Sequence, residues 1–215
     1  MDDILDGYAV AATPSLIERY ESFDFETLYK PVLDLLPDLP MRVADIGAGT
    51  GRDAAWLADR GHHVLAIEPV KELRDAGVRL HPSNRIDWLD DRLPTLGKAQ
   101  SRGPFDLILL CGVWQHIDDE ARRMAMQAIS RSAKAGGLLI MSLRHGPGAP
   151  GRRVFHISPA ATIEAADGSG FSLLRRSEAD SIQPENQAAG VRWTWLVFRK
   201  EGSSGGASSD PEQAN

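Results

Sequence analysis

Several features that mark particular classes of protein are scarce or missing in this sequence of 215 residues. Cys111 is the single cysteine, which excludes an internal disulfide and any metal site built from several cysteines. No apolar run approaches the roughly 20 residues that a membrane helix needs. The acidic start MDDILDGY is unlike a secretory signal. We therefore expect a cytoplasmic protein without a metal ion and without a membrane as a partner.

Basic residues are fewer than acidic residues in this sequence. Lys and Arg total 24 against 30 Asp and Glu, so the formal net charge is −6. This balance disfavours a protein devoted to nucleic acid, and we do not expect nucleic acid as a partner. The exception is the stretch 121–163, which contains basic side chains and no acidic one.

Composition divides the chain into three parts. Residues 1–39 predict a helical segment, residues 40–200 one α/β domain, and residues 201–215 a polar Gly/Ser-rich tail that we expect to be disordered. Thr13-Pro14 is typical of a helix N-terminus, and the apolar spacing over 25–36 predicts a second helix. This first segment either covers a site as a lid or packs on the domain.

From residue 42 onwards, β-rich runs alternate with helical patterns. Five runs predict parallel strands joined by right-handed crossovers: 42–46, 63–68, 85–89, 105–110 and 138–143. Two later runs, 171–175 and 191–198, have no predicted helix between them and should pair antiparallel. We therefore predict an α/β fold, a Rossmann-like doubly wound seven-stranded sheet of five parallel strands closed by an antiparallel pair, with helices on both faces.

One of the predicted helices, which begins after Asp118, carries a regular apolar stripe. Its members recur at helical spacing: Ala121, Met124, Ala125, Ala128 and Ile129. We expect this stripe to face the sheet and Gly136-Gly137 to end the helix.

A glycine-rich loop, DIGAGTG (45–51), links the first predicted strand to a helix. Its backbone can approach a ligand closely, with the amides of the helix pointing at it. Glu68 ends the next strand, where a carboxylate can accept both hydroxyls of a ribose. Arg52 stands where the dinucleotide fingerprint needs a small residue, which argues against a nicotinamide oxidoreductase.

These residues resemble the class I S-adenosylmethionine-dependent methyltransferases. DIGAGTG matches the first motif of that family and Glu68 its ribose-binding acid, while FDLILLCGVWQHI (105–117) and KAGGLLIMS (134–142) match the fourth- and fifth-strand regions. VWQHI followed by SLRHGP is similar to a bacterial subset with small-molecule-type members, and GRDAA to tellurite-resistance-type enzymes. The resemblance implies a methyltransferase with S-adenosyl-L-methionine as cofactor and S-adenosyl-L-homocysteine as product.

The resemblance also implies cofactor-binding positions. Asp90 or Asp91 would lie near the adenine amino group, and the sequence does not decide between them. The Cys111 carbonyl would meet an amino group of the cofactor, while its thiol packs as a small apolar filler. The expected set is Asp45, Gly47, Ala48, Gly49, Gly51, Arg52, Glu68, Pro69, Asp90, Asp91, Cys111 and Gly112.

Residues after the fourth and fifth strands are candidates for the acceptor side, because ligands of this topology lie beyond the carboxyl ends of the strands. His116 is the best candidate for a general base, and its alternative is a histidine that bonds the backbone before a helix. His145 has the same ambiguity, and Arg144 beside it is a further catalytic candidate. Trp114 either forms a wall for the acceptor or packs in the core.

Basic side chains in this region indicate the charge of the acceptor. Arg152 and Arg153 would recognise a carboxylate or phosphate, and the alternative is a solvated face on a Gly/Pro-rich loop. Tyr8 and Tyr20 would reach the site if the first segment is a lid.

The predicted function is methyl transfer by in-line displacement to a small, anionic acceptor, by a monomer or homodimer. The alternatives are methylation of RNA, DNA or protein, and a non-catalytic S-adenosylmethionine-binding protein.

Overall fold

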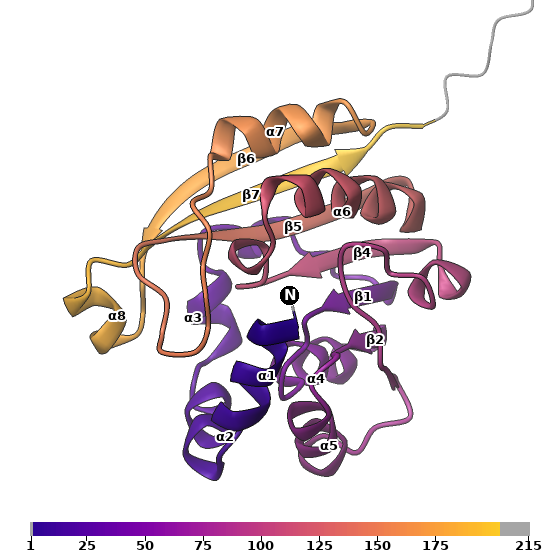
Figure 1. Ribbon diagram of the computed structural model, residues 1–215. Helices are drawn as coiled ribbons and strands as arrows, with labels where there is room; N and C mark the ends of the chain where they lie inside the picture. The colour runs from indigo at the N-terminus through magenta and orange to yellow at the C-terminus, as the bar shows by residue number, and fades with distance from the viewer. Residues whose placement is uncertain (1, 203–215) are drawn as a thin grey trace, which may run out of the picture.

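The computed structural model describes residues 2–202, which form a sheet with helices on both of its faces (Figure 1). The sheet has seven strands in the order β3-β2-β1-β4-β5-β7-β6. The strands are β1 (Arg42–Ile46), β2 (His63–Ile67), β3 (Ile86–Leu89), β4 (Phe105–Leu110), β5 (Ala133–His145), β6 (Phe171–Asp180) and β7 (Arg192–Lys200). The tail expected to be disordered falls, from residue 203 onwards, outside the described residues.

The directions of the strands confirm the predicted fold class. β1 to β5 pair in parallel, and β7 pairs antiparallel with both β5 and β6. β6 therefore runs in the same direction as the first five strands, and β7 alone is reversed. The start of β7 lies at the edge where the parallel strands end, which brings Trp193 to that edge.

Helices alternate with the strands along the chain, as the crossovers of a parallel sheet require. They are α1 (Asp2–Ala11), α2 (Pro14–Glu21), α3 (Phe25–Tyr29), α4 (Arg52–Asp59), α5 (Lys71–Leu80), α6 (Asp119–Ser132), α7 (Pro159–Asp167) and α8 (Pro184–Ala188). Short 3-10 turns occupy Leu33–Leu35, Ala99–Arg102 and Trp114–His116. None of the helices within residues 2–202 is both long enough and apolar enough to cross a bilayer.

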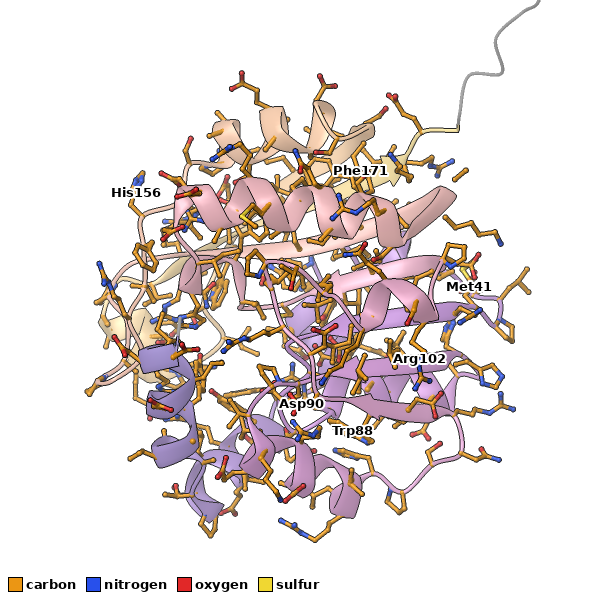
Figure 2. All side chains as sticks on the ribbon, turned by 45° about the vertical axis from the view of Figure 1, so that its right-hand side comes forward. Met41, Trp88, Asp90, Arg102, His156 and Phe171 are labelled. Carbon is orange, nitrogen blue, oxygen red and sulfur yellow. The ribbon has the colours of Figure 1, made fainter. Side chains whose placement is uncertain are left out.

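Each face of the sheet has its own apolar core. Successive residues of β4 alternate between the two cores: Leu107 and Leu109 pack with α3 and α4, while Ile108 and Leu110 pack with α6 and α7. Figure 2 shows Trp88 and Phe171 near opposite ends of this arrangement, on the edge strands β3 and β6. A sheet covered on both faces explains why β4 is apolar nearly throughout.

The helix α6 corrects part of the sequence interpretation. Met124 is 46% exposed, while Met126 is fully buried. The buried side of α6 also includes Arg122, whose guanidinium donates to Asp119 and to the backbone oxygen of His156. Gly136-Gly137 does not end the helix either, since β5 begins directly after it.

The N-terminal segment contains more helix than expected. The predicted start at Thr13 is confirmed, because its side chain caps α2. The apolar run over 25–36 is a short helix followed by a 3-10 turn, with Pro31 between them. The helix α1 was not foreseen. The boundary between residues 39 and 40 remains a prediction.

Candidate functional site

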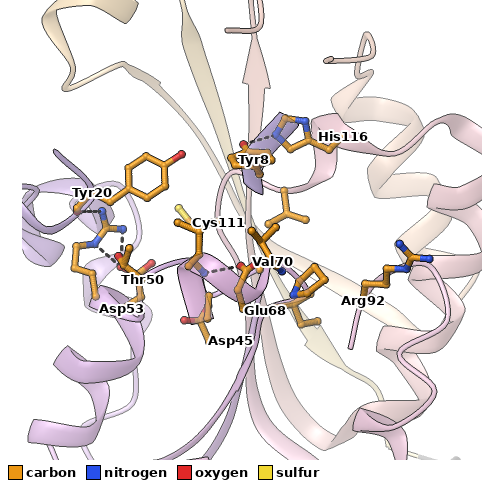
Figure 3. Close-up of a pocket in the computed structure, with 18 of the residues that line it drawn as sticks. Tyr8, Tyr20, Asp45, Thr50, Asp53, Glu68, Val70, Arg92, Cys111 and His116 are labelled. Carbon is orange, nitrogen blue, oxygen red and sulfur yellow. Dashed lines mark hydrogen bonds and ion pairs between the residues drawn. The ribbon is translucent and has the colours of Figure 1, made fainter. Parts of the chain in front are cut away.

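A cavity of about 230 Å³ lies beyond the carboxyl ends of β1, β2 and β4 (Figure 3). Its floor is the loop between β1 and α4, and its other walls come from the ends of β2 and β4, the segment after β3, and the N-terminal helices. We call it the loop cavity. Most of the residues expected to bind a cofactor line it: Asp45, Gly47, Ala48, Gly49, Arg52, Glu68, Pro69, Asp91 and Cys111.

The glycine loop exposes main chain to the loop cavity at Gly49. This residue has a φ of 59°, in the left-handed region that favours glycine. A Cβ placed there would have only the Tyr20 ring near it, at 4.0 Å. Gly51 has a different role, because a Cβ there would lie 2.6 Å from the Trp88 indole. Gly51 therefore permits packing and does not line the cavity.

Glu68 is buried at the end of β2, and backbone amides hold both of its carboxylate oxygens. Gly49 N donates to Oε2 and Val70 N donates to Oε1, each at 2.8 Å. Each oxygen keeps a further lone pair for a ligand. Burial raises the pKa of this carboxyl to about 7, although the two amides oppose the shift.

Asp45 is the second buried acid of the loop cavity, at the end of β1. Its side chain is 2% exposed, and Oδ2 has no hydrogen-bond partner among the described residues. Desolvation and the neighbouring Asp53 raise the pKa of Asp45 well above its usual range. An unpartnered buried carboxyl oxygen in a cavity is a position for a ligand donor.

Arg52 lines the loop cavity as part of a buried network. Its Nε donates to Asp53 Oδ1 at 2.7 Å, and Tyr29 Oη donates to Asp53 Oδ2 at 2.7 Å. A third bond runs from Arg52 Nη1 to the Tyr20 carbonyl, at 3.2 Å. The network fixes the start of α4 against α2 and α3.

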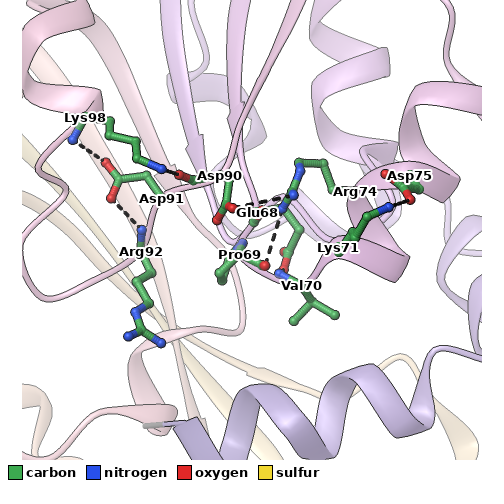
Figure 4. A network of polar contacts seen from close by, with 10 residues as sticks. All are labelled: Glu68, Pro69, Val70, Lys71, Arg74, Asp75, Asp90, Asp91, Arg92 and Lys98. Carbon is green, nitrogen blue, oxygen red and sulfur yellow. Dashed lines mark hydrogen bonds and ion pairs between the residues drawn. The ribbon is translucent and has the colours of Figure 1, made fainter.

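The structure distinguishes the positions of Asp90 and Asp91, which the sequence left open (Figure 4). Asp91 lines the loop cavity, and its carboxylate accepts from the amides of Arg92, Lys98 and Ala99 at 2.8 Å. Asp90 does not line the cavity and forms an exposed ion pair with Arg74 at 3.6 Å. Asp91 thus shapes the turn that borders the cavity.

The end of β4 contributes Cys111 but not Gly112. Desolvation raises the pKa of the Cys111 thiol to about 12, so the thiol stays protonated. Ser142 Oγ lies 3.6 Å from the sulfur, and it also accepts a 2.9 Å bond from Gly112 N. Gly112 therefore supports the loop after β4 from outside the loop cavity. Within residues 2–202, no three histidine, cysteine or acidic side chains gather to hold a metal ion.

A second cavity of about 230 Å³ adjoins the first, and we call it the arginine cavity. Five residues line both cavities: Tyr8, Tyr20, His116, Gln183 and Trp193. The arginine cavity adds Arg19, Arg144 and Arg152, with Glu185 as its one acid among the described residues.

Two of these arginines are held in place. Arg144 Nη2 donates to Asn186 Oδ1 at 3.1 Å and to the Pro147 carbonyl at 2.7 Å. Arg152 Nη1 donates to Tyr20 Oη at 3.3 Å, while its buried Nε has no partner among the described residues. The cavity therefore presents fixed positive charge and one unused buried donor.

His116 lines both cavities and forms a hydrogen bond with Tyr8. Its Nε2 lies 2.8 Å from Tyr8 Oη, and its Nδ1 lies 2.8 Å from the carbonyl oxygen of Arg153. Desolvation lowers the pKa of His116, and the charges of Arg144 and Arg152 add to this effect. The imidazole is therefore neutral at neutral pH.

Three candidates from the sequence lie outside both cavities. His145 bonds Thr194 Oγ1 at 2.8 Å, on the face of β5 opposite to that of Arg144. Trp114 is 1% exposed and belongs to the core, so its indole forms no wall for an acceptor. The exposed Arg153 guanidinium lies 4.5 Å from the centre of the Phe155 ring. Arg153 contributes to the site only through its backbone carbonyl, which bonds His116.

Sequence reasoning missed Trp193 and Gln183, which line both cavities. A usable signal existed for Trp193. A strand that runs antiparallel to its neighbours starts at the edge where they end, so the first residues of 191–198 had to lie near the site. Gln183 lies just before α8, a helix that no pattern had indicated.

The sequence from residue 20 to 204 matches a family model described as a methyltransferase domain. An uncharacterised methyltransferase of Mycobacterium tuberculosis is 32% identical over 109 residues, which are 49% of this chain and 40% of that relative. The chain thus spans less than half the length of this curated relative.

Solved structures share the fold at low sequence identity. The 1,6-didemethyltoxoflavin-N1-methyltransferase of Burkholderia thailandensis has a TM-score of 0.64 at 18% identity, covering 94% of this chain and 85% of that one. A TehB-like SAM-dependent methyltransferase of Corynebacterium glutamicum has a TM-score of 0.60 at 22% identity, covering 88% and 100%.

Proposed function

Because the chain belongs to the methyltransferase-domain family, we propose that it is an S-adenosylmethionine-dependent methyltransferase with a small, anionic acceptor. The loop cavity would hold the cofactor, and the arginine cavity the acceptor. One observation carries this division: the two cavities share a wall that includes Tyr8, His116 and Trp193, so that ligands in them would be neighbours. In-line displacement needs such a placement.

The residues of the loop cavity fit an adenosyl amino acid. The free lone pairs of Glu68 would accept the ribose hydroxyls, and the open main chain at Gly49 lets the ligand approach. Asp45 Oδ2 would accept from the ammonium group, which would lower the pKa of Asp45 again. When bound, the cofactor supplies an activated methyl group on a sulfonium, and the protein aligns the acceptor and excludes water.

The arginine cavity supports an anionic acceptor. Arg144 and Arg152 line one space, and guanidinium groups match the geometry of carboxylates and phosphates. The buried, unpartnered Nε of Arg152 is a donor that an anion would satisfy. The B. thailandensis structure contains both 1,6-didemethyltoxoflavin and S-adenosylhomocysteine, which supports a small molecule as the acceptor.

Calorimetry with S-adenosylhomocysteine tests the cofactor half of this proposal. We expect the wild type to bind, and Glu68→Gln to bind about tenfold or more weakly, because hydrogen bonds to a charged group contribute about 1.5–3 kcal/mol. Asp90→Asn is the matched control and should bind like the wild type. No heat from the wild type, or equal heat from Glu68→Gln, would overturn the assignment.

Turnover on a panel of small molecules tests the acceptor half. We expect S-adenosylhomocysteine to form with carboxylate or phosphate acceptors and not with their neutral esters or amides. Arg152→Ala should raise the KM for such an acceptor, and Arg153→Ala should leave it unchanged. Equal turnover of charged and neutral partners would show that the arginines do not select the acceptor.

A further inference from the structure

We propose that Tyr8 takes the proton of the acceptor during methyl transfer, and that His116 works through Tyr8 as a positioning residue that receives Tyr8's own proton. This inference rests on the proposed function and deepens it. It implies that the attacking atom arrives carrying a proton, as in a hydroxyl group or an amine.

The backbone decides which ring nitrogen of His116 carries hydrogen. The carbonyl oxygen of Arg153 lies 2.8 Å from Nδ1, and a carbonyl can only accept. Nδ1 therefore carries the hydrogen, and Nε2 keeps its lone pair. That lone pair faces Tyr8 Oη at 2.8 Å and Gln115 Nε2 at 3.2 Å. Both nitrogens of His116 thus have partners, and neither is left to meet an acceptor directly.

Tyr8 and His116 both line the two cavities, and Figure 3 shows the Tyr8 hydroxyl facing the His116 ring. Its hydroxyl donates to Nε2 of His116, which leaves the lone pairs of the phenol oxygen free to accept a hydrogen bond. The two rings meet edge-on, with centres 5.3 Å apart and an interplanar angle of 89°. The Tyr8 ring has a second contact, with the Arg152 guanidinium, which lies 5.3 Å from the centre of the ring. The phenol is therefore fixed in place.

Burial keeps both members of this pair neutral before transfer. Desolvation raises the pKa of Tyr8, and Tyr20 and Glu68 add to the rise while Arg152 and Arg144 oppose it. The pKa of His116 is lowered by desolvation and by the same two arginines, and raised by its bond to the Arg153 carbonyl. A neutral phenol beside a neutral imidazole can pass a proton along without separating charge in advance.

The transfer balances as follows. The acceptor oxygen or nitrogen forms its bond to the methyl carbon as the carbon–sulfur bond breaks, and the electron pair of that bond leaves with the sulfur. The proton of the acceptor passes to Tyr8 Oη. The original Tyr8 proton passes to Nε2 of His116, and the positive charge gained there is stabilised by the Arg153 carbonyl on Nδ1.

The geometry also narrows the acceptor. An anionic group held by Arg144 and Arg152, and a hydroxyl or neutral amine at Tyr8 Oη, belong to one molecule of the hydroxy acid, amino acid or hydroxyaryl phosphate kind. A plain carboxylate attacked at its own oxygen has no proton to give, so Tyr8 would have no part in its methylation.

Nitrogen NMR of the full chain with ¹⁵N-labelled histidine, saturated with S-adenosylhomocysteine, tests the hydrogen-bonded pair without an acceptor. We expect His116, identified by the loss of its signal in His116→Gln, to be the neutral form protonated at Nδ1 at pH 7. Tyr8→Phe should move its Nε2 signal, while Arg153→Ala, which keeps the backbone carbonyl, should not. Protonation at Nε2, or an Nε2 signal that ignores Tyr8→Phe, would overturn the proposal.

Turnover with two probes tests the proton path. 4-Hydroxybenzoate carries a protonated nucleophile and benzoate does not. Tyr8→Phe should lower kcat for 4-hydroxybenzoate about 100-fold while changing its KM less than threefold. His116→Gln should lower kcat and remove the fall of kcat that the wild type shows as pH drops through the pKa of His116.

Two outcomes of the turnover test separate this inference from the proposed function. If both probes turn over and Tyr8→Phe retains wild-type kcat for 4-hydroxybenzoate, the proposed function stands and the role of Tyr8 is wrong. If the wild type methylates neither probe, the proposed acceptor class fails, and the NMR result alone then supports or overturns the pair.

Discussion

The amide of Gly49 donates a 2.8 Å hydrogen bond to Oε2 of Glu68, so the glycine loop and the buried acid at the end of β2 hold each other in place. Glu68 is 19 residues further along the chain, directly after the neighbouring strand β2. The carboxylate therefore has two tasks, since it fixes the loop and also presents lone pairs to the cavity. Its unusual pKa makes the first task measurable without any ligand.

Stability of the unliganded protein should fall as pH rises from about 4.5 to about 7. Burial raises the pKa of Glu68 from 4.5 to about 7. The folded state thus binds more protons than the unfolded state in this window, and stability is lost as pH rises through it. Relative to Glu68→Gln, the wild type should lose up to about 3 kcal/mol of unfolding free energy. Urea denaturation at several pH values measures this. Parallel curves for wild type and Glu68→Gln would contradict it.

Gly49→Ala and Gly51→Ala should separate ligand approach from packing. Gly49→Ala has room for its Cβ, so its cost is the left-handed backbone, about 1–2 kcal/mol, together with weaker binding of S-adenosylhomocysteine. Gly51→Ala adds a clash with Trp88, which costs about 1–3 kcal/mol more. Gly97→Ala, with nothing within 4 Å of its Cβ, is the control. Equal stabilities of the first two variants in urea would disprove the distinction.

Tyr29→Phe should destabilise the protein by about 1–3 kcal/mol, because it leaves Asp53 Oδ2 buried without its donor. Tyr20→Phe removes a longer hydrogen bond of 3.3 Å from a half-buried ring, and it should cost less. Thermal unfolding of both variants measures the difference. A Tyr29→Phe variant as stable as the wild type would show that Arg52 alone satisfies Asp53.

Met126→Ala should cost about 2–5 kcal/mol, whereas Met124→Ala should stay within about 0.5 kcal/mol of the wild type. The two methionines are two residues apart on α6, but Met126 is fully buried and Met124 is 46% exposed. Urea denaturation of the pair checks the observed orientation of the helix. Equal costs would mean that α6 is rotated about its axis.

The parts of the fold that follow from local patterns were predictable. The strand Phe105–Leu110 was predicted with its observed bounds, because a run apolar on both sides is typical of a strand covered on both faces. The glycine loop and Glu68 were also predictable from a local pattern, because strand, turn, helix and acid follow one another within about two dozen residues.

Other features depended on contacts between distant segments. The helix α1 was not predicted, although Ile4, Leu5 and Tyr8, which line the loop cavity, recur at helical spacing. Nothing in the composition distinguishes Trp114 in the core from Trp193 at the site. Strand alternation, however, would have told Arg144 from His145, because adjacent residues of a strand point to opposite faces.

The walls of the arginine cavity come mostly from the two ends of the described chain. Tyr8, Arg19 and Tyr20 precede β1, and the segment from Arg144 to Trp193 follows the start of β5. The loop that faces the proposed cofactor, with Glu68, lies between them. Substitutions before β1 or after the start of β5 can therefore alter the walls of the arginine cavity while leaving Glu68 and the glycine loop as they are.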